Sequence, residues 1–310
     1  MEIYKRHRPT KLSEVLGQSE SVTTLETFFK TGKLPHALML QGPSGIGKTS
    51  IARILRDKLQ CSEMDYFEIN CAAIDGAMET IRDIGKNMQA RPWSGDARMW
   101  YLDEFQSLSR AGFAQQSMLK MLEDTPSHVY FILATTDPTK IIPAIRTRCT
   151  TLTLTSLDSK TLTSLLEKVA EAEELDLSGR ILVQIAEAAG GSARQALVLL
   201  EQVSQLSEEE EQLKVIGAGE GSAQGIDLCR AIAKKASWVQ VAKILKELDE
   251  EPEKVRQLML GYARSSLLAS EKNVWAYRMI DALRTPFYEG SKNANQAFLT
   301  AACFFMMHGT

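Results

Sequence analysis

The sequence predicts an α/β protein: a doubly wound parallel sheet in the first half of the chain, followed by helical domains. Three observations predict this class. Short apolar runs of β-forming residues alternate with helical patterns up to about residue 155. A glycine-rich loop joins the first of these runs to the first long helical pattern after it. Beyond residue 157 the apolar spacing is helical and no strand pattern follows.

The strands are expected at five short apolar runs. These runs are residues 37–40, 66–69, 99–102, 129–133 and 151–154. Helical segments lie between them, and strands that alternate with helices form parallel sheets through crossover connections. Residues 157–208 and 224–308 are predicted to be helical.

The loop after the first strand matches the pattern G-x-x-x-x-G-K-[ST] of a nucleotide-triphosphate loop. Its predicted binding residues are Gly42, Pro43, Ser44, Gly45, Ile46, Gly47, Lys48, Thr49 and Ser50. The glycines let the backbone curl so that successive N–H groups point at phosphates, and the following helix N-terminus adds partial positive charge. We expect Lys48 to reach the β- and γ-phosphates of ATP and Thr49 to hold Mg²⁺.

Polar residues follow two later strands. Asp103 and Glu104 end the 99–102 run and project toward the phosphate loop, because the ends of parallel strands share one sheet edge. We expect Asp103 to hold Mg²⁺ and Glu104 to polarise the attacking water. Thr136, favoured over Thr135, is expected beside the γ-phosphate; an ordinary turn hydroxyl is the alternative. Arg148 is either a solvated charge or an arginine finger that reaches a neighbouring subunit.

The bulk composition restricts the class of protein. The 44% apolar and 24% charged residues are typical of a globular chain. No run of about 18 apolar residues occurs, and the polar N-terminus is unlike a signal peptide, so we expect a cytoplasmic protein (host cytoplasm if phage-encoded). The five cysteines form no C-x-x-C pair, which disfavours a zinc site.

The charge is distributed unevenly along the chain. The net charge is −3, and the first 150 residues carry 19 Lys and Arg against 17 Asp and Glu, whereas the rest carry 17 against 22. Any nucleic-acid contact is therefore expected mainly in the first half of the chain.

In this order the motifs resemble those of the AAA+ ATPases and, within them, the clamp loaders. The resemblance extends from Tyr4 to about Gln202. Segments 4–9 and 15–18 are similar to the family's adenine-binding boxes. Residues 191–197 are similar to the family's second-sensor motif. The resemblance implies nucleotide contacts at Tyr4, Arg8, Pro9, Val15 and, from the lid, Arg194. It also implies that Thr136 is the first sensor and Arg148 the finger that acts in trans.

The chain departs from the family pattern at several places. Thr147 replaces the serine of the finger motif, and Gln195 replaces the acid that follows the sensor arginine in bacterial relatives. The four-cysteine pattern of the bacterial subunit does not occur in this sequence, and we do not expect that subunit's long tail. The compact chain is similar to the small loader subunits of eukaryotes and archaea and to the large loader subunit of T4-type phages. A phage or archaeal-type source is therefore favoured.

The resemblance also implies a domain plan and binding surfaces. We expect an AAA+ nucleotide-binding domain at 1–156, a helical lid at 157–214 and a helical collar for oligomerisation at 215–310. Residues on two helices are expected to follow the DNA backbone, and a tip of the first domain to dock on the sliding clamp. The DNA set is Arg82, Lys86 and Lys120, and the clamp set is Met88, Pro92 and Trp93. The alternatives are solvated charges for the first set and packing on its own domain for Trp93.

The predicted function is that of an ATPase stimulated by DNA and by the clamp. It helps to open a ring-shaped sliding clamp and to load it on primer–template DNA. The implied partners are further copies or paralogues in a ring-like or spiral assembly with a different small subunit, the clamp, and primer–template DNA. Two alternatives stay open: a branch-migration or remodelling AAA+ ATPase, and a structural loader subunit that binds ATP without hydrolysing it. A Holliday-junction motor would need a winged-helix domain with strands, and the intact Lys48, Asp103, Glu104 and Arg148 disfavour a structural subunit.

Overall fold

The computed structural model describes residues 2–111, 113–219, 223–248, 252–269, 273–285 and 292–308. The chain divides into two compact units, Met1–Gln205 and Leu206–Thr310. Each unit has its own apolar core. The three-domain plan of the sequence analysis stays a prediction.

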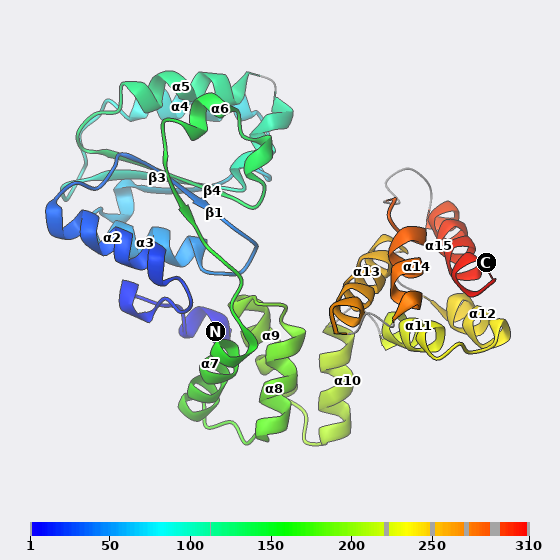
Figure 1. Cartoon of the computed structure of the whole chain (residues 1–310). Coiled ribbons are helices and arrows are strands. Elements are labelled where there is room, and N and C mark those ends of the chain that lie inside the picture. The colour runs from blue at the N-terminus through cyan, green and yellow to red at the C-terminus, as the bar shows by residue number, and fades with distance from the viewer. Residues whose placement is uncertain are drawn as a thin grey trace. The chain divides into compact units, whose positions relative to one another are not determined.

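One parallel sheet forms the centre of the first unit (Figure 1). The order across the sheet is β2-β3-β4-β1-β5, and all neighbouring strands are parallel. The strands are β1 (Ala37–Gln41), β2 (Tyr66–Asn70), β3 (Arg98–Asp103), β4 (Val129–Thr135) and β5 (Thr150–Thr153). Each coincides with a predicted run to within two residues at either end. The predicted doubly wound sheet is thus confirmed.

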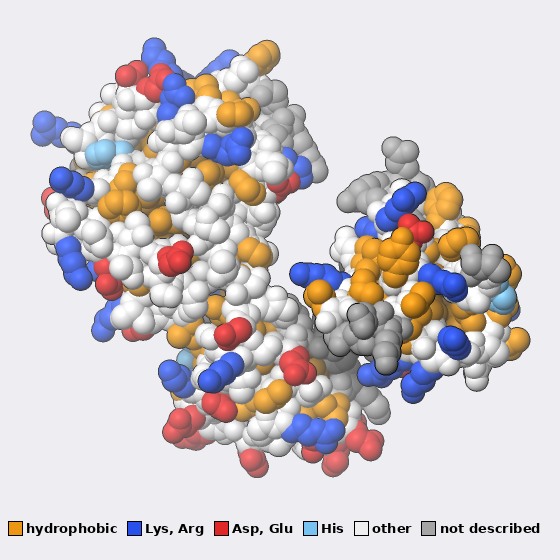
Figure 2. Space-filling model, viewed as in Figure 1, with side chains coloured by type: hydrophobic (Ala, Val, Ile, Leu, Met, Phe, Trp, Pro, Cys, Tyr) orange, Lys and Arg blue, Asp and Glu red, His pale blue; other side chains and the backbone are white. Residues whose placement is uncertain are grey.

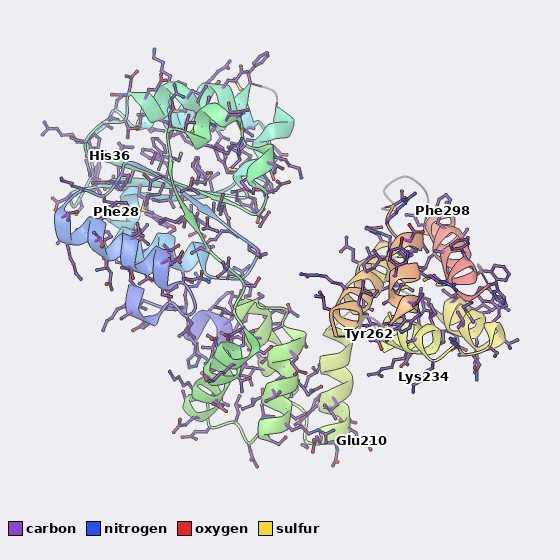
Figure 3. All side chains as sticks on the ribbon, in the orientation of Figure 1. Phe28, His36, Glu210, Lys234, Tyr262 and Phe298 are labelled. Atoms are coloured by element: carbon purple, nitrogen blue, oxygen red, sulfur yellow. The ribbon has the colours of Figure 1, made fainter. Side chains whose placement is uncertain are left out.

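Helices cover both faces of the sheet (Figure 1). On one face lie α2 (Ser19–Thr31) and α3 (Lys48–Lys58), and on the other lie α4 (Ala77–Asn87), α5 (Ala114–Glu123) and the short α6 (Pro143–Arg146). Because both faces are covered, the inner strands are apolar along almost their whole length, as in the Val129–Thr135 strand. His36, which precedes β1 and is labelled in Figure 3, stacks on Tyr130 with 4.8 Å between the ring centroids.

Short helices complete the first unit. The N-terminal helix α1 (Ile3–Arg6) contacts α9, and three helices follow the sheet. They are α7 (Ser159–Ala172), α8 (Gly179–Ala188) and α9 (Ala193–Val203). Asp158, Ser178 and Ser192 cap their N-termini by accepting a backbone N–H with the side chain. These caps explain where each helix begins.

The second unit is helical in its described residues. Its helices are α10 (Glu209–Gly219), α11 (Ala223–Ala233), α12 (Trp238–Glu247), α13 (Pro252–Ala269), α14 (Val274–Ala282) and α15 (Lys292–His308). Its core includes the fully buried Leu228, Val255, Met259, Met279 and Leu299. Figure 2 shows apolar side chains gathered on the visible face of this unit. Among the helices that the structure describes, none has the length and apolar composition needed to cross a membrane.

Candidate nucleotide site

The phosphate loop adopts a conformation that its glycines make possible. Gly45 has a φ of +76° and Gly47 a φ of +111°, in the left-handed region that L side chains rarely occupy. A Cβ on Gly45 would lie 2.1 Å from the hydroxyl of Ser192. The backbone N–H of Arg194 donates to the carbonyl of Gly45 (3.2 Å), so the loop is tied to the start of α9.

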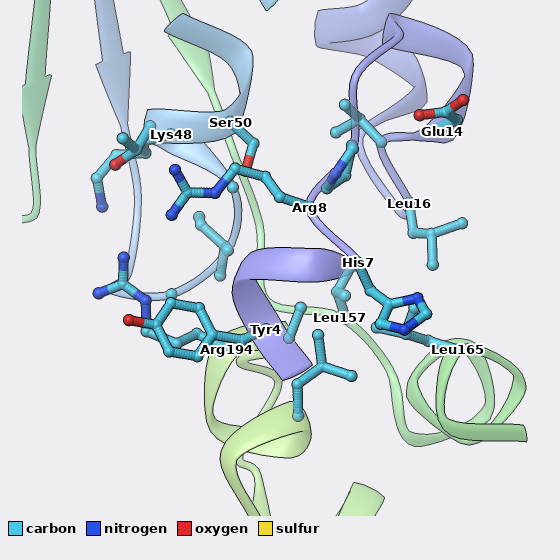
Figure 4. A pocket seen from close by; sticks show the side chains of 18 of the residues that line it. Tyr4, His7, Arg8, Glu14, Leu16, Lys48, Ser50, Leu157, Leu165 and Arg194 are labelled. Atoms are coloured by element: carbon cyan, nitrogen blue, oxygen red, sulfur yellow. The ribbon is translucent and has the colours of Figure 1, made fainter. Parts of the chain in front are cut away.

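A cavity of about 560 Å³ opens beside this loop (Figure 4). It lies within the first unit, between the N-terminal segment, the loop, the end of β3, and helices α7 and α9. The predicted residues that line it are Tyr4, Arg8, Pro9, Val15, Ser44, Gly45, Ile46, Gly47, Lys48, Thr49, Ser50, Asp103, Glu104 and Arg194. Gly42, Pro43 and Thr136 are not among the lining residues. The structure therefore brings most of the predicted nucleotide site together.

Sequence reasoning missed several lining residues. They are Ser13, Glu14, Leu157, Leu165, Lys168 and Val169, whereas the lining residues His7, Leu16, Ala193 and Leu197 lie within the segments 4–9, 15–18 and 191–197 that the resemblance assigned to nucleotide binding. Most of the apolar ones come from the chain after the sheet and give the cavity an apolar end, where Leu16 and Leu165 lie near His7 (Figure 4). The helical spacing of Leu165 and Val169 was visible in the sequence, but it indicated only a buried helix face and no cavity.

Lys48 is almost fully buried at the other end of the cavity. Its ammonium group donates to the carbonyls of Gly42 (2.8 Å) and Pro43 (2.7 Å). Burial lowers the pKa of Lys48, and the carboxylates of Asp103 and Glu104 oppose that shift. The lysine thus places a cation at the loop, with two carboxylates facing it.

Asp103 and Thr49 bring oxygen atoms to the same end of the cavity. Burial raises the pKa of Asp103, although its carboxylate accepts the N–H of Glu104 (3.0 Å). The Thr49 hydroxyl lies 3.1 Å from the hydroxyl of Tyr101. A partly buried carboxylate and a hydroxyl that line the same cavity are a donor set that suits a hard cation such as Mg²⁺.

Glu104 is held by two polar side chains. Its backbone has a φ of +51°, which is uncommon for a residue other than glycine. The amide nitrogen of Gln106 donates to Oε2 of Glu104 (2.5 Å) and to the hydroxyl of Thr136 (2.8 Å). The Thr136 hydroxyl lies 3.4 Å from the same Oε2. Thr136 is therefore an exposed neighbour of Glu104 that does not line the cavity, and no sequence signal indicated Gln106.

Tyr4, Arg8 and Arg194 form a polar side of the cavity (Figure 4). The guanidinium of Arg194 lies over the Tyr4 ring, 5.7 Å from its centroid. Burial lowers the pKa of Arg8, with further lowering by the charges of Arg53 and Arg194. Two arginines at one cavity wall favour an anionic ligand.

The candidate finger Arg148 lies outside the cavity. It donates through Nε to Glu123 (2.8 Å) at the end of α5, with a second contact through Nη2, and through Nη1 to the Ala144 carbonyl (2.8 Å). The side chain of Arg148 is 34% exposed. It is therefore accessible from outside its own subunit, as a finger acting in trans requires.

The predicted clamp tip needs one correction. Trp93 is 82% exposed, but Met88 is only 1% exposed and packs in the core between the sheet and α4. Met88 continues the apolar spacing of Ile81 and Ile84 on α4, so it faces inward and cannot serve as an exposed anchor. Of the predicted clamp set, Trp93 is exposed and Pro92 is partly exposed.

Buried Asp65 supports the backbone of this tip. Its carboxylate accepts the N–H groups of Trp93 (2.9 Å) and Ser94 (3.1 Å) and pairs with Arg98 (2.8 Å). Burial alone would raise the pKa of Asp65, but these hydrogen bonds and one from Ser62 lower it to about 2. The tip is thus fixed at its base while Trp93 extends into solvent.

The predicted DNA residues lie on the adjacent helices α4 and α5. Arg82 and Lys120 line one groove of about 290 Å³ between these helices. Lys86 is not among its lining residues; its side chain is 76% exposed and lies 3.3 Å from Asp83. The two helices thus bring cations from separate parts of the sequence to one surface.

Family models match the first half of the chain, and known proteins match most of it. The family model described as DNA polymerase III, delta subunit, matches residues 65–158, and the Sigma-54 interaction domain model matches residues 15–82. DNA polymerase III subunit tau of Escherichia coli is 35% identical over 219 residues, which cover 64% of this chain and 34% of that protein. Subunit tau of Bacillus subtilis is 31% identical over 297 residues, covering 86% and 51%. The chain therefore spans about a third to a half of the length of these relatives.

A solved structure shares the fold. RuvB of Thermotoga maritima, a Holliday junction branch migration motor, superposes with a TM-score of 0.58 and 21% identity over 73% of this chain and 79% of that one. At this identity the likeness is one of fold alone. The order of the five parallel strands and the position of the phosphate loop after β1 agree with that shared fold. In sequence, the chain is similar to the tau and gamma/tau subunits of DNA polymerase III, as the resemblance of its motifs predicted.

Proposed function

We propose that this chain is an ATP-hydrolysing subunit of a clamp loader, which helps to open a ring-shaped sliding clamp and load it on primer–template DNA. One observation supports this most directly. A single cavity is lined by the phosphate loop, the Asp103–Glu104 pair and Arg194 of α9. The proposed ligand is ATP, with the base at the apolar end near Leu16 and Leu165 and the phosphates at the loop.

Magnesium is the proposed companion of ATP. Thr49 and Asp103 would hold it, and the cation would neutralise charge on the phosphate oxygens during transfer. Two protein oxygens are few, but Mg²⁺ usually keeps several waters and binds substrate phosphates as well. The oxygen ligands of Thr49 and partly buried Asp103 are of the hard type that Mg²⁺ prefers.

The reaction assigned to the chain is attack of water on the γ-phosphorus. An oxygen–phosphorus bond forms, the bond to the bridging oxygen of ADP breaks, and the water's proton passes to Glu104. Lys48 and Arg194 stabilise charge on the phosphates. Thr136, whose hydroxyl lies 3.4 Å from Oε2 of Glu104, helps to orient that carboxylate. Arg148 of a neighbouring subunit supplies the remaining positive charge in trans, so a lone subunit should turn over slowly.

The proposed partners follow from the outer surface of the first unit. Arg82, Lys86 and Lys120 are placed to follow a duplex backbone without reading bases. Trp93, with Pro92 beside it, is an exposed aromatic anchor suited to a pocket on the clamp. Further copies or paralogues of this chain, together with a different small subunit, complete the assembly.

Steady-state ATP hydrolysis by the purified chain tests the proposal. Rates are compared without DNA, with a primer–template junction and with a four-way junction, each with and without a candidate clamp. Lys48→Ala, which removes the buried cation, is the inactive control, and Lys58→Ala on the same helix is the matched control that retains activity. We expect the primer–template to stimulate hydrolysis in the wild-type chain and in Lys58→Ala.

The other possible outcomes of this experiment would each contradict the proposed function. Preferential stimulation by the four-way junction would replace the loader with a branch-migration motor. Tight ATP binding without hydrolysis, even with DNA, clamp and neighbouring subunits present, would make the chain a structural loader subunit. Activity that survives in Lys48→Ala would contradict the assignment of the cavity itself.

A further inference from the structure

Gln106 is a buried carboxamide whose hydrogen-bonding groups are all used. It follows β3 in the 3₁₀ segment Phe105–Ala111 and is 9% exposed. Its Oε1 accepts from the hydroxyl of Thr135 (2.8 Å), and its Nε2 donates to Glu104 (2.5 Å) and Thr136 (2.8 Å). One side chain therefore joins the end of β3 to the end of β4.

The orientation of this carboxamide is fixed by its neighbours. The backbone N–H of Asp137 donates to the hydroxyl oxygen of Thr135 (3.1 Å), which leaves the hydroxyl proton to be donated to Gln106. An oxygen must then face Thr135, so the NH₂ group faces Glu104 and Thr136. Thr135 is completely buried and pairs with Gln41 of β1. The chain of hydrogen bonds from Thr135 through Gln106 to Glu104 therefore begins on a rigid strand.

This arrangement distinguishes the two oxygens of Glu104. Oε2 accepts the N–H of Gln106, a charge-assisted bond, and lies 3.4 Å from the Thr136 hydroxyl. In the part of the chain that the structure describes, no hydrogen bond engages Oε1. Since Glu104 lines the cavity, one oxygen is fixed and the other is left to accept a proton from water.

We propose that Gln106 is a positioning residue for hydrolysis: it holds Oε2 of Glu104 beside Thr136, so that Oε1 faces the attacking water. The role rests on the proposed function, because it assigns Glu104 as the base. Gln106 does not line the cavity proposed to bind the nucleotide. Its loss should therefore affect the chemical step and leave ATP binding intact.

The kinetic test separates turnover from binding. Gln106→Met keeps the length of the side chain and removes both polar ends. With primer–template DNA and Mg²⁺ present, we expect kcat to fall by about 10- to 100-fold, as for a displaced catalytic group, with KM and the dissociation constant of a fluorescent ATP analogue changed less than about 2-fold. Gln184→Met, on α8 where the glutamine donates to Glu187, is the matched control and should keep wild-type kcat. An unchanged kcat in Gln106→Met, or a fall matched by an equal loss of ATP affinity, would overturn the proposal.

A second measurement does not depend on turnover. The side-chain NH₂ signals of Gln106 in the ¹⁵N-labelled wild-type chain are identified as the pair lost in Gln106→Glu. We expect them to shift in Glu104→Gln and to stay in place in Glu123→Gln, a matched change on exposed α5. Signals unmoved by Glu104→Gln would refute the contact. A wild-type chain that binds ATP without hydrolysing it would refute the proposed function instead, and the NH₂ signals would still decide whether Gln106 holds Glu104.

Discussion

The nucleotide cavity and the outer layer, which comprises α4, α5, α6 and the tip at Pro92–Ser94 with its supporting Asp65, use functional side chains in opposite ways. In the cavity, Lys48 and Asp103 are buried among groups of their own chain, and their pKa values are shifted by that burial. In the outer layer, Lys86 and Trp93 are 76% and 82% exposed. The cavity side chains are arranged by contacts within one chain, whereas these side chains of the outer layer are exposed to solvent. Changes in the cavity should therefore affect the isolated chain, and changes in the outer layer only the assembly.

Removal of the Arg148 side chain should give the largest effect, and it tests most directly the contrast between the cavity and the outer layer. Arg148→Ala should lower ATP hydrolysis by about 10³-fold in an assembly with neighbouring subunits, because a trans finger stabilises transition-state charge. The slow turnover of the isolated chain should not change. Steady-state hydrolysis, measured as subunits are titrated together, checks both statements. Arg146→Ala, an exposed arginine two residues earlier, is the control; equal losses in the two variants would contradict the finger.

Loss of Asp103 should have the next largest effect, and it should appear in the isolated chain. Asp103→Asn removes the charge proposed to hold Mg²⁺, so we expect hydrolysis to fall by about 10²-fold and the Mg²⁺ concentration for half-maximal activity to rise. A magnesium titration of the hydrolysis rate measures both. Asp57→Asn, on exposed α3 surface, should titrate like the wild type. A normal magnesium requirement in Asp103→Asn would show that another group holds the cation.

The contrast also explains what the sequence could predict. The sequence could predict that the phosphate loop and Asp103–Glu104 lie together, as they do at one cavity, because local patterns indicate both: a glycine loop after one strand and carboxylates after another. The strands were found because a sheet covered on both faces needs continuous apolar runs. The apolar end of the cavity was missed because it is formed by the approach of α7 and α9, which no local pattern encodes.

Met88 and Gln106 show the two ways in which prediction from local patterns failed: a pattern was present but not applied, or no pattern existed. Met88 was misplaced although its spacing from Ile81 and Ile84 already indicated the buried face of α4. Gln106 could not have been found, since a glutamine after Asp-Glu has many uses and only the fold brings Thr135 and Thr136 to it. Patterns predict the residues of one segment, whereas contacts between segments need the fold.

Asp65 is the exception in the outer layer, because it is buried and acts within its own chain. Its pKa is about 2 in the folded chain against an ordinary 3.8, and a lowered pKa stabilises the fold above the unfolded value. Asp65→Asn should therefore reduce the free energy of unfolding by about 2 kcal/mol at pH 7. In the wild type this contribution should be complete above about pH 4 and fall away toward pH 2.

Urea denaturation of the first unit at a series of pH values measures that loss. Asp96→Asn, an exposed carboxylate near the tip, should behave as the wild type. Trp93→Ala should change stability by less than about 0.5 kcal/mol, because the side chain is exposed. If Asp65→Asn were as stable as Asp96→Asn, the tip would not depend on its buried carboxylate.

The cations of α4 and α5 should give the smallest effects, each visible only with DNA. Arg82→Ala, Lys86→Ala and Lys120→Ala should each weaken binding to a primer–template by a few-fold, equally for unrelated sequences, and reduce the slope of log affinity against log salt by about 1. Fluorescence anisotropy at several salt concentrations measures that slope. Lys30→Ala, on α2 across the sheet, is the control and should keep the full slope. Arg82 and Lys120 share one groove, so their double variant should lose about the sum of the two slopes if both meet phosphates. A slope that changes as much in Lys30→Ala would mean that binding follows the net charge of the unit and not this surface.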